Sequence, residues 1–420
     1  MIASLRNWLP GSRQRLTSLV DSVRASFGAL SALALALGLI AGLGLPEIDG
    51  WLQAKVPLFD FSTQEAARSM LETIATVMVS VAGIAFSVTI VAFTLATNQL
   101  SPRVLRSFRR DLVSQLTLAA FLGTFVYCLA LLARLGSIGS LGDQVPSISI
   151  AIAVLLALAS LALFAVFVGH IATMLQPSSV INSIAADARP ELERPFPAGV
   201  GGEPEDPEAS QEVAERRMRE APGSAVECAS EGYLVGVRGA EILAAACEAR
   251  GLVRQRCQIG DYLLPGQELA VAWAPEKREA EALAARVAGC FETGRQRTLP
   301  QDPGFPIRQL ADVALKGLSP GINDPTTAIN AMEAITAGLI RLARSERPSP
   351  VRLDGDAEPR FIADAPEFDQ LVVLGFEQAL AFAGDDPLVW RRLHELLRTV
   401  VEAAPAPGPH SRIRLLLASA

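Results

Sequence analysis

Four stretches of this chain, each 22 residues or longer, contain no Asp, Glu, Lys or Arg, and they constrain its fold more than any other feature. They comprise residues 25–46, 73–102, 112–133 and 144–186. A bilayer core about 30 Å thick needs about 20 helical residues to cross it. We therefore predict four transmembrane helices, near residues 26–46, 71–97, 113–134 and 147–173. The first has no Ala-X-Ala motif leading into Glu47, so we expect an uncleaved anchor rather than a signal peptide.

The arginines near the predicted spans gather on one side of the membrane. The N-terminal segment and the loop after the second span together hold Arg6, Arg13, Arg15, Arg24, Arg103, Arg106, Arg109 and Arg110. The opposite side has only Lys55 and Arg68 in the first loop. Because Lys and Arg concentrate in cytoplasmic loops, we predict a cytoplasmic N-terminus. An even number of spans then returns the C-terminus to the cytoplasm.

The composition excludes several classes of protein. Half of the residues are hydrophobic and 19% are charged, which fits neither a disordered chain nor an ordinary soluble enzyme. The net charge of −7 offers no basic surface for nucleic acid. Five cysteines without a C-x-x-C pair and three histidines give no zinc or disulfide framework, and reduced thiols suit the cytoplasm. Phosphate-loop, dinucleotide and zinc-protease motifs are also absent from the sequence, so we expect no catalytic residue, metal or cofactor.

These patterns predict an α-helical membrane protein with a cytoplasmic α+β module followed by a helical domain. Residues 1–25 are expected to form either an interfacial helix or a solvated basic leader, and both interpretations stay open. Residues 26–176 would form the four-helix transmembrane domain. Residues 177–225 would continue the last helix and then form an acidic linker rich in Pro and Gly. Residues 226–300 would form the α+β module, and residues 301–420 the helical domain.

The pattern of the C-terminal part also predicts its individual elements. Strands are expected at residues 232–237, 252–257, 268–273 and 291–298, and helices at 208–220, 240–249 and 276–288. Further helices are expected from residue 307 onwards and at 325–344, 366–383 and 386–403. Residues 346–360, rich in Pro, Asp and Glu, would form a loop or insertion.

A row of hydroxyl and small residues follows the second span with spacings of three and four. Its members are Thr73, Thr76, Ser80, Gly83, Ser87, Thr94 and Thr97. Within lipid, such a row is typical of close helix packing with interhelical hydrogen bonds. The functional alternative is a polar pore lining, with Thr76, Ser80, Gly83, Ser87 and Thr94 around an axis shared by several subunits. Charged residues are absent from the apolar runs, which argues against an ion-coupled transporter.

The segment SPGINDPTTA, residues 319–328, reads as a stiff corner between two helices. Pro320 and Gly321 favour a turn, Asp324 is a suitable N-cap, and Pro325 suits the first helical position. The alternative is an anion or phosphate site at the helix N-terminus, assisted by Lys316 or Arg308. Its candidate residues would be Ser319, Gly321, Asn323, Asp324, Thr326 and Thr327. The carboxylate of Asp324 opposes an anion there, so the corner is the favoured interpretation.

Two features lie at the predicted cytoplasmic ends of the spans. Arg103, Arg106, Arg109 and Arg110 in the segment SPRVLRSFRRD serve as determinants of orientation or, alternatively, as a site for lipid head groups. His170 is the one titratable candidate near the end of the fourth span. It is interpreted as a packed interfacial side chain, with a pH-sensing or ligand role as the alternative.

Three segments carry a resemblance to a known family. They are SPRVLRSFRRD at 101–111, QLTLAAFLGTFVYCL at 115–129 and RQRTLPQDPGFPIRQLADVALKGLSPGINDPTTAINAM at 295–332. With them the chain resembles a family of predicted bacterial membrane proteins, the domain-of-unknown-function family 2254. The resemblance covers most of the chain and implies a multi-span inner-membrane protein with a cytoplasmic C-terminal domain. It implies no particular activity.

Two functions from different classes are consistent with the sequence. The first is an oligomeric ion channel or passive pore, in which copies of this chain form a homo-oligomer in the lipid bilayer and a cytoplasmic domain regulates the opening. The second is a membrane-anchored scaffold or sensor whose cytoplasmic domain binds a protein or a small ligand.

Overall fold

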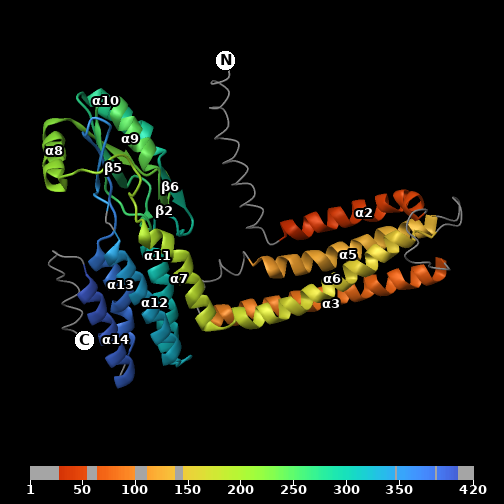
Figure 1. Ribbon diagram of the computed structural model, residues 1–420. Helices are drawn as coiled ribbons and strands as arrows, with labels where there is room; N and C mark the ends of the chain where they lie inside the picture. Colours follow the sequence, from red (N-terminus) through yellow and green to blue (C-terminus); the bar gives the residue numbers. More distant parts are fainter. Residues whose placement is uncertain are drawn as a thin grey trace, which may run out of the picture. The chain divides into compact units, whose positions relative to one another are not determined.

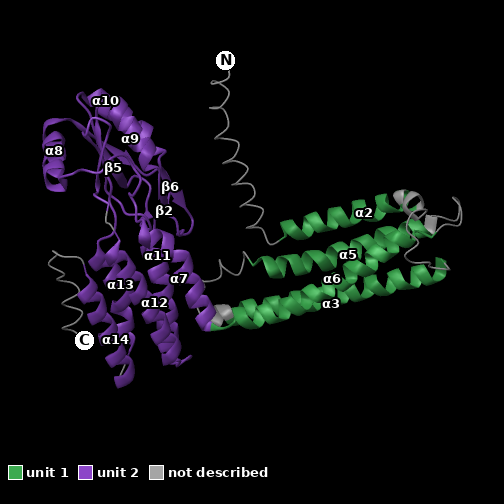
Figure 2. Cartoon of the chain, viewed as in Figure 1, with its two compact units in different colours: residues 1–176 green, residues 177–420 purple. Residues whose placement is uncertain are grey.

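The computed structural model describes residues 28–53, 64–99, 111–137, 145–345, 348–383 and 386–404. The chain forms two compact units, residues 1–176 and 177–420, which we call unit 1 and unit 2 (Figures 1 and 2). The expected interfacial segment, residues 1–25, lies outside the described residues, and so do Arg103, Arg106, Arg109 and Arg110.

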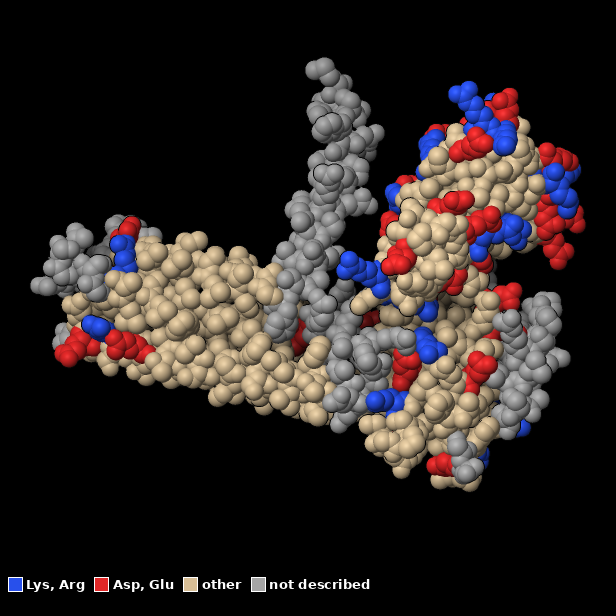
Figure 3. Space-filling model, turned by 180° about the vertical axis from the view of Figure 1, so that it is seen from behind, with Lys and Arg blue, Asp and Glu red and all other residues tan. Residues whose placement is uncertain are grey.

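Unit 1 contains four long helices in its described residues. They are α2 (Ala29–Gln53), α3 (Gln64–Gln99), α5 (Leu112–Ser137) and α6 (Ser147–Met174). Each includes a stretch long and apolar enough to cross a membrane, so the four predicted spans are confirmed as helices. On the face drawn in Figure 3, the charged side chains of these helices lie near the helix ends.

Helix α5 packs against each of the other three helices of unit 1. Its contact with α2 is unusually close, because three glycines meet there. A Cβ atom added at Gly38 would lie 2.4 Å from the carbonyl oxygen of Gly123, and one at Gly42 would lie 2.8 Å from that of Tyr127. Gly38 and Gly42 stand four residues apart on α2, the spacing with which small residues let two membrane helices approach.

Unit 2 is built around two β-sheets. The five-stranded sheet has the order β1 (Gly223–Glu227), β5 (Glu268–Trp273), β3 (Leu252–Gln255), β8 (Pro359–Ile362) and β7 (Val351–Leu353). The three-stranded sheet has the order β4 (Tyr262–Leu263), β2 (Gly232–Val237) and β6 (Phe291–Gly294). Helices α9 (Gly239–Glu248) and α10 (Lys277–Ala288) pack on the strands. The strands and helices predicted between residues 232 and 294 are confirmed.

The remaining helices of unit 2 are α7 (Pro177–Glu193), α8 (Pro207–Glu220), α11 (Gly304–Leu318), α12 (Pro325–Arg344), α13 (Phe368–Phe382) and α14 (Pro387–Ala403). Helix α12 has the predicted bounds, and α13 and α14 agree with prediction to within two residues. Helix α7 packs beside α12 (Figure 1).

Two expectations for unit 2 were wrong. Residues 346–360 are not simply a loop, because Val351–Leu353 and Pro359–Ile362 form a hairpin and β8 pairs in parallel with β3. The predicted division at residue 300 therefore does not separate two modules. Strand β8 has only four residues and charged neighbours, so its sequence lacks the alternation of apolar and polar residues that predicts a strand.

The segment expected as a linker is also packed into unit 2. Phe196 and Val200 are buried in the same core as Phe361. Arg352, whose side chain is buried, donates hydrogen bonds to the carbonyl oxygens of Val200 and Gly201 and pairs with Glu203 at 2.9 Å. Because the segment is rich in proline and acidic residues, it was expected to have little apolar surface to bury. The buried side chain of Arg352 nevertheless binds its backbone carbonyl oxygens, a contact that composition cannot predict.

The glycine contact between α2 and α5 generates a first prediction. Replacing Gly38 by Ala forces a methyl group against the carbonyl of Gly123, which we expect to destabilise unit 1 by about 1–3 kcal/mol. The matched control is Gly44→Ala, since a Cβ at Gly44 meets no atom within 4 Å. On helix propensity alone, that control should be neutral or slightly stabilising. Thermal unfolding of both purified variants in detergent measures the difference, and equal midpoints would contradict the close contact.

Candidate functional sites

The hydroxyl row predicted on the second span lies on the exposed side of α3. Thr76, Ser80, Gly83, Ser87 and Thr94 are all exposed, and a Cβ at Gly83 meets no atom within 4 Å. The opposite side of α3 is buried against the other helices of unit 1 and consists of Leu71, Ala75, Met78, Ala82, Ala85 and Ala92. Within the described part of the chain, the row therefore does not mediate helix packing.

Three hydroxyls of the row, those of Thr76, Ser80 and Thr94, bond to their own helix. Thr76 donates to the carbonyl of Glu72 at 2.8 Å, Ser80 to that of Thr76 at 2.7 Å, and Thr94 to that of Ile90 at 2.9 Å. The hydroxyl protons of Thr76, Ser80 and Thr94 are thus satisfied within α3, while their oxygens keep acceptor capacity. Such a surface can face another polar helix or water more favourably than it faces lipid.

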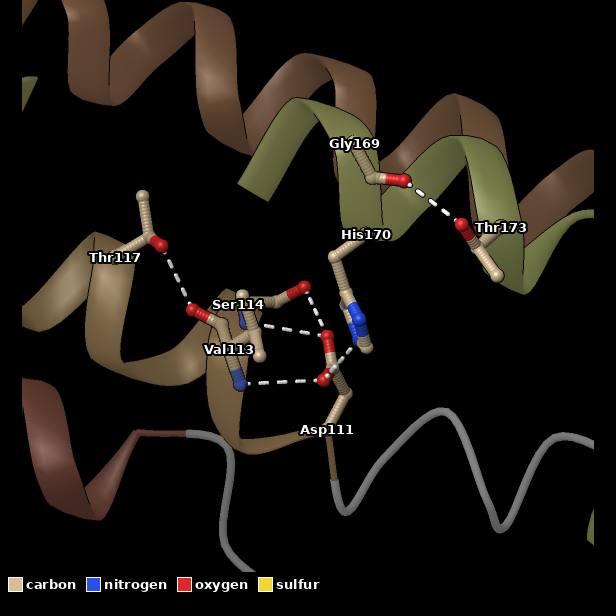
Figure 4. A network of polar contacts seen from close by, with 7 residues as sticks. All are labelled: Asp111, Val113, Ser114, Thr117, Gly169, His170 and Thr173. Atoms are coloured by element: carbon tan, nitrogen blue, oxygen red, sulfur yellow. Dashed lines mark hydrogen bonds and ion pairs between the residues drawn. The ribbon is translucent and has the colours of Figure 1, made fainter. Parts of the chain in front are cut away.

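A second polar site joins α5 to α6 through Asp111 and His170 (Figure 4). The Nε2 atom of His170 lies 2.8 Å from Oδ1 of Asp111, whose carboxylate is buried. The same carboxylate accepts the backbone N–H groups of Val113 at 3.2 Å and Ser114 at 3.1 Å, and also the Ser114 hydroxyl. Asp111 is thus the N-cap of α5 and at the same time the partner of His170.

An aspartate also lies at the opposite end of α6. Asp49 belongs to α2 and is buried, yet its carboxylate accepts the backbone N–H groups of Ile148 at 3.2 Å and Ser149 at 3.0 Å. It caps a helix that begins almost 100 residues later in the chain. Nearby, the Tyr127 hydroxyl donates to the Ser149 carbonyl at 2.9 Å. Helix α6 is therefore fixed by carboxylates at both ends.

The SPGINDPTTA segment forms the corner between α11 and α12. Asp324 accepts the backbone N–H of Thr327 at 3.0 Å and its hydroxyl at 2.6 Å, so a carboxylate occupies the N-terminus of α12. Asn323 has a left-handed backbone with φ of 48°, and Ser319 accepts its N–H at 2.8 Å. Gly321 and Thr326 are exposed. The geometry favours the corner over an anion site, since Arg308 pairs with Asp312 at 3.2 Å rather than serving this N-terminus.

Unit 2 contains a cavity of about 310 Å³ where the β-sheets meet the helices. Phe196, Phe368 and Leu371 contribute apolar surface, and the charged lining residues are Asp364 and Glu367. Six prolines also line it: Pro195, Pro197, Pro303, Pro348, Pro350 and Pro366. A cavity with this lining suits an apolar small molecule that is neutral or cationic, because both charged groups are carboxylates.

The contacts of Asp49 and Asp111 and the cavity of unit 2 were not predicted from the sequence. His170 was singled out, but its partner lies 59 residues earlier and was visible only as the last residue of an arginine-rich segment. The cavity draws on residues from 195 to 371. Four of its prolines, Pro195, Pro197, Pro348 and Pro350, lie in the segments expected as a linker and a loop.

The contact between Asp111 and His170 generates a second prediction. A double-mutant cycle of Asp111→Ala and His170→Ala should give a coupling energy of about 0.5–3 kcal/mol in thermal unfolding, because the two side chains share one short contact. Thr173→Ala is the matched control on the same helix, since the Thr173 hydroxyl donates only to the Gly169 carbonyl (Figure 4). That control should be additive with Asp111→Ala. Additivity in the His170 cycle as well would show that the pair contributes no stability.

Comparisons with known proteins agree with this architecture. The model of the predicted membrane protein family DUF2254 matches residues 24–399. Uncharacterised proteins of Mycobacterium bovis and Mycobacterium tuberculosis are 28% identical over 416 residues, covering 96% of this chain and 77% of each relative. No solved structure matches. With nearly its whole length matched, the chain belongs to the DUF2254 family of predicted membrane proteins.

Proposed function

We propose that this protein is an oligomeric channel or passive pore, assembled around α3 in the bacterial inner membrane. The observation that carries the proposal is the exposed hydroxyl row of α3, set opposite the face by which α3 packs into its own chain. Hydroxyl groups that face lipid find no hydrogen-bond partner there. Around an axis shared by several copies, the same hydroxyls would face water or the hydroxyl rows of the other copies.

The spacing of the row supports assembly through α3. Its members recur every three and four residues, an average of 3.5, which is the period of left-handed helix bundles. Copies of α3 can therefore stay in contact along their length while supercoiling around one another. The interior of unit 1 offers a less suitable path, because Thr124 and Ser160 are buried there in a mutual contact of 3.3 Å, close to the ring pair of Phe121 and Phe164.

In this proposal both termini are cytoplasmic, following the distribution of arginine around the spans. Unit 2 then lies in the cytoplasm and regulates the pore or its assembly. The proposal requires no catalytic residue, metal or cofactor.

The first measurement is the oligomeric state of the full chain in nanodiscs by native mass spectrometry. A closed ring of several copies is expected, and a monomer would rule out the shared axis. Reconstituted bilayers should then show conductance steps under voltage, tension or a change of pH. A ring that never conducts would contradict the pore while leaving the assembly intact.

The third prediction concerns the row itself. Ser80→Leu and Ser87→Leu place bulky apolar side chains on the proposed lining, so conductance should fall at least tenfold without loss of folding. Val79→Leu is the matched control, because Val79 is also exposed and is adjacent to Ser80 but outside the row. Equal conductance of the serine variants and this control would contradict the lining.

A second function, a sensor that binds a small ligand, is favoured by the cavity of unit 2. Its carboxylates and aromatic rings suit an apolar amine. The test is a thermal-shift screen of the full chain with hydrophobic amines. Stabilisation that disappears in Leu371→Trp, which fills the cavity, and survives in Leu264→Trp on the surface would support this function. Stabilisation that is insensitive to both changes would place the amine elsewhere.

A further inference from the structure

The cavity of unit 2 lies beyond the ends of two parallel strands. Strands β3 and β8 pair in parallel, so their carboxyl ends lie at the same edge of the five-stranded sheet. Ile259 follows shortly after β3 and Asp364 shortly after β8, and both residues line the cavity. In sheets of parallel strands, ligands bind in the space beyond the carboxyl ends of the strands. The cavity occupies the corresponding position here.

The residues at the end of β3 hold Asp364 in place. Nε2 of Gln258 donates to Oδ1 of Asp364 at 3.2 Å. Gln258 is itself fixed, because its backbone N–H donates to Oδ2 of Asp261 at 2.7 Å. Nε2 of Gln255 donates to the backbone carbonyl of Asp364 at 3.1 Å and to that of Cys257 at 2.7 Å. Both the backbone and the side chain of Asp364 are therefore positioned before any ligand binds.

The second carboxylate oxygen of Asp364 keeps its capacity to accept hydrogen bonds. In the described part of the chain, Oδ2 has no hydrogen-bond or ion-pair partner, and the described lining of the cavity contains no Lys or Arg. The side chain is half-buried among apolar groups, so water solvates it incompletely. A positively charged donor is the partner that such a carboxylate binds most strongly.

The other two polar side chains of the described lining are less suited to bind a charged ligand. The Gln301 amide is occupied, because its Oε1 accepts the backbone N–H of Val237 at 2.9 Å and its Nε2 donates to the carbonyl of the same residue at 3.2 Å. Glu367 is exposed, and its carboxylate accepts a backbone N–H group as the cap of α13. Water and salt screen an exposed charge of this kind.

We infer that Asp364 binds the ammonium group of a small apolar monoamine in this cavity, and that Gln258 is the positioning residue for its carboxylate. This inference rests on the sensor function proposed above and deepens it, because it assigns the recognition of charge to one of the two carboxylates. The rings of Phe196 and Phe368 and the prolines of the lining would enclose the apolar part of the ligand.

The size and the charge of the cavity limit the ligand further. A volume of about 310 Å³ is at the lower end of the range for ligand cavities, which is about 300–1,000 Å³. A single half-buried carboxylate can compensate one positive charge. A diamine would place its second ammonium group against proline and aromatic side chains, where nothing replaces its hydration. The cavity therefore favours one ammonium group on one compact apolar body.

The test is isothermal titration calorimetry of the full chain in nanodiscs with phenethylamine and phenethyl alcohol. The two probes have nearly the same shape, and at neutral pH they differ by an ammonium group in place of a hydroxyl. Asp364→Asn removes the charge and keeps an acceptor for Gln258. Glu367→Gln is the matched control, because it removes the other carboxylate of the lining. Empty nanodiscs give the reference titration for each probe.

Asp364→Asn should weaken the binding of phenethylamine about tenfold or more, because a hydrogen bond between two charged groups is lost. The binding of phenethyl alcohol should stay unchanged, which also shows that the variant is folded. Gln258→Ala should weaken the binding of the amine alone, by about threefold, through the lost hydrogen bond to Asp364. Glu367→Gln should change the affinity for either probe by less than about twofold, as expected for an exposed charge.

Two results would overturn the role of Asp364 and leave the sensor function standing. One is an equal loss of amine and alcohol binding in Asp364→Asn, and the other is an equal effect of Asp364→Asn and Glu367→Gln on the amine. In both cases the wild-type chain would still bind the probes, and Leu371→Trp would still abolish that binding. If the wild-type chain bound neither probe, the role of Asp364 and the sensor function would fall together.

Discussion

Two carboxylates that cap helix ends hold the transmembrane helices of unit 1 in register. A bilayer gives apolar helices little reason to prefer one neighbour over another, so polar contacts and close packing decide the arrangement. Asp49 of α2 caps α6, while Asp111 caps α5 and contacts His170 near the other end of α6. Unsatisfied N–H groups at a helix start are costly in an apolar environment. Each aspartate therefore stabilises one helix end and, through the same oxygens, selects the helix that packs beside it.

Two further contacts then determine which side of α3 is exposed. They are the glycine contact between α2 and α5 and the packing of the alanine-rich face of α3. Gly38 and Gly123 bring two backbones together, which makes α5 the central helix. Helix α3 packs through small and apolar residues such as Ala75 and Ala82. Its hydroxyl row consequently packs against no other described helix of the chain, and for this reason the proposed pore would form between copies.

The sequence predicted best where one physical property decides the outcome. Charge-free runs predicted the spans because a bilayer excludes charge, and Asp324 followed by Pro325 marked the start of α12 because both residues suit a helix N-terminus. Prediction from the sequence failed where the structure of a segment depends on contacts with residues far away in the chain. The parallel pairing of β3 with β8 joins residues about 108 apart, and composition could not predict that Arg352 would bury the supposed linker. The hydroxyl row was found, but the side that it faces depended on the packing of α3 against α5 and α6.

The cavity of unit 2 lies at one end of two long helices, α7 and α12. Pro195–Pro197, at the cavity, follow directly after α7, and Leu342 of the cavity lies in the last turns of α12. Each helix is about 25–30 Å long and packs along the other, so a ligand that displaced Leu342 or Phe196 would move rigid elements rather than flexible loops. A ligand in the cavity would therefore act first on the packing of α7 against α12 within unit 2.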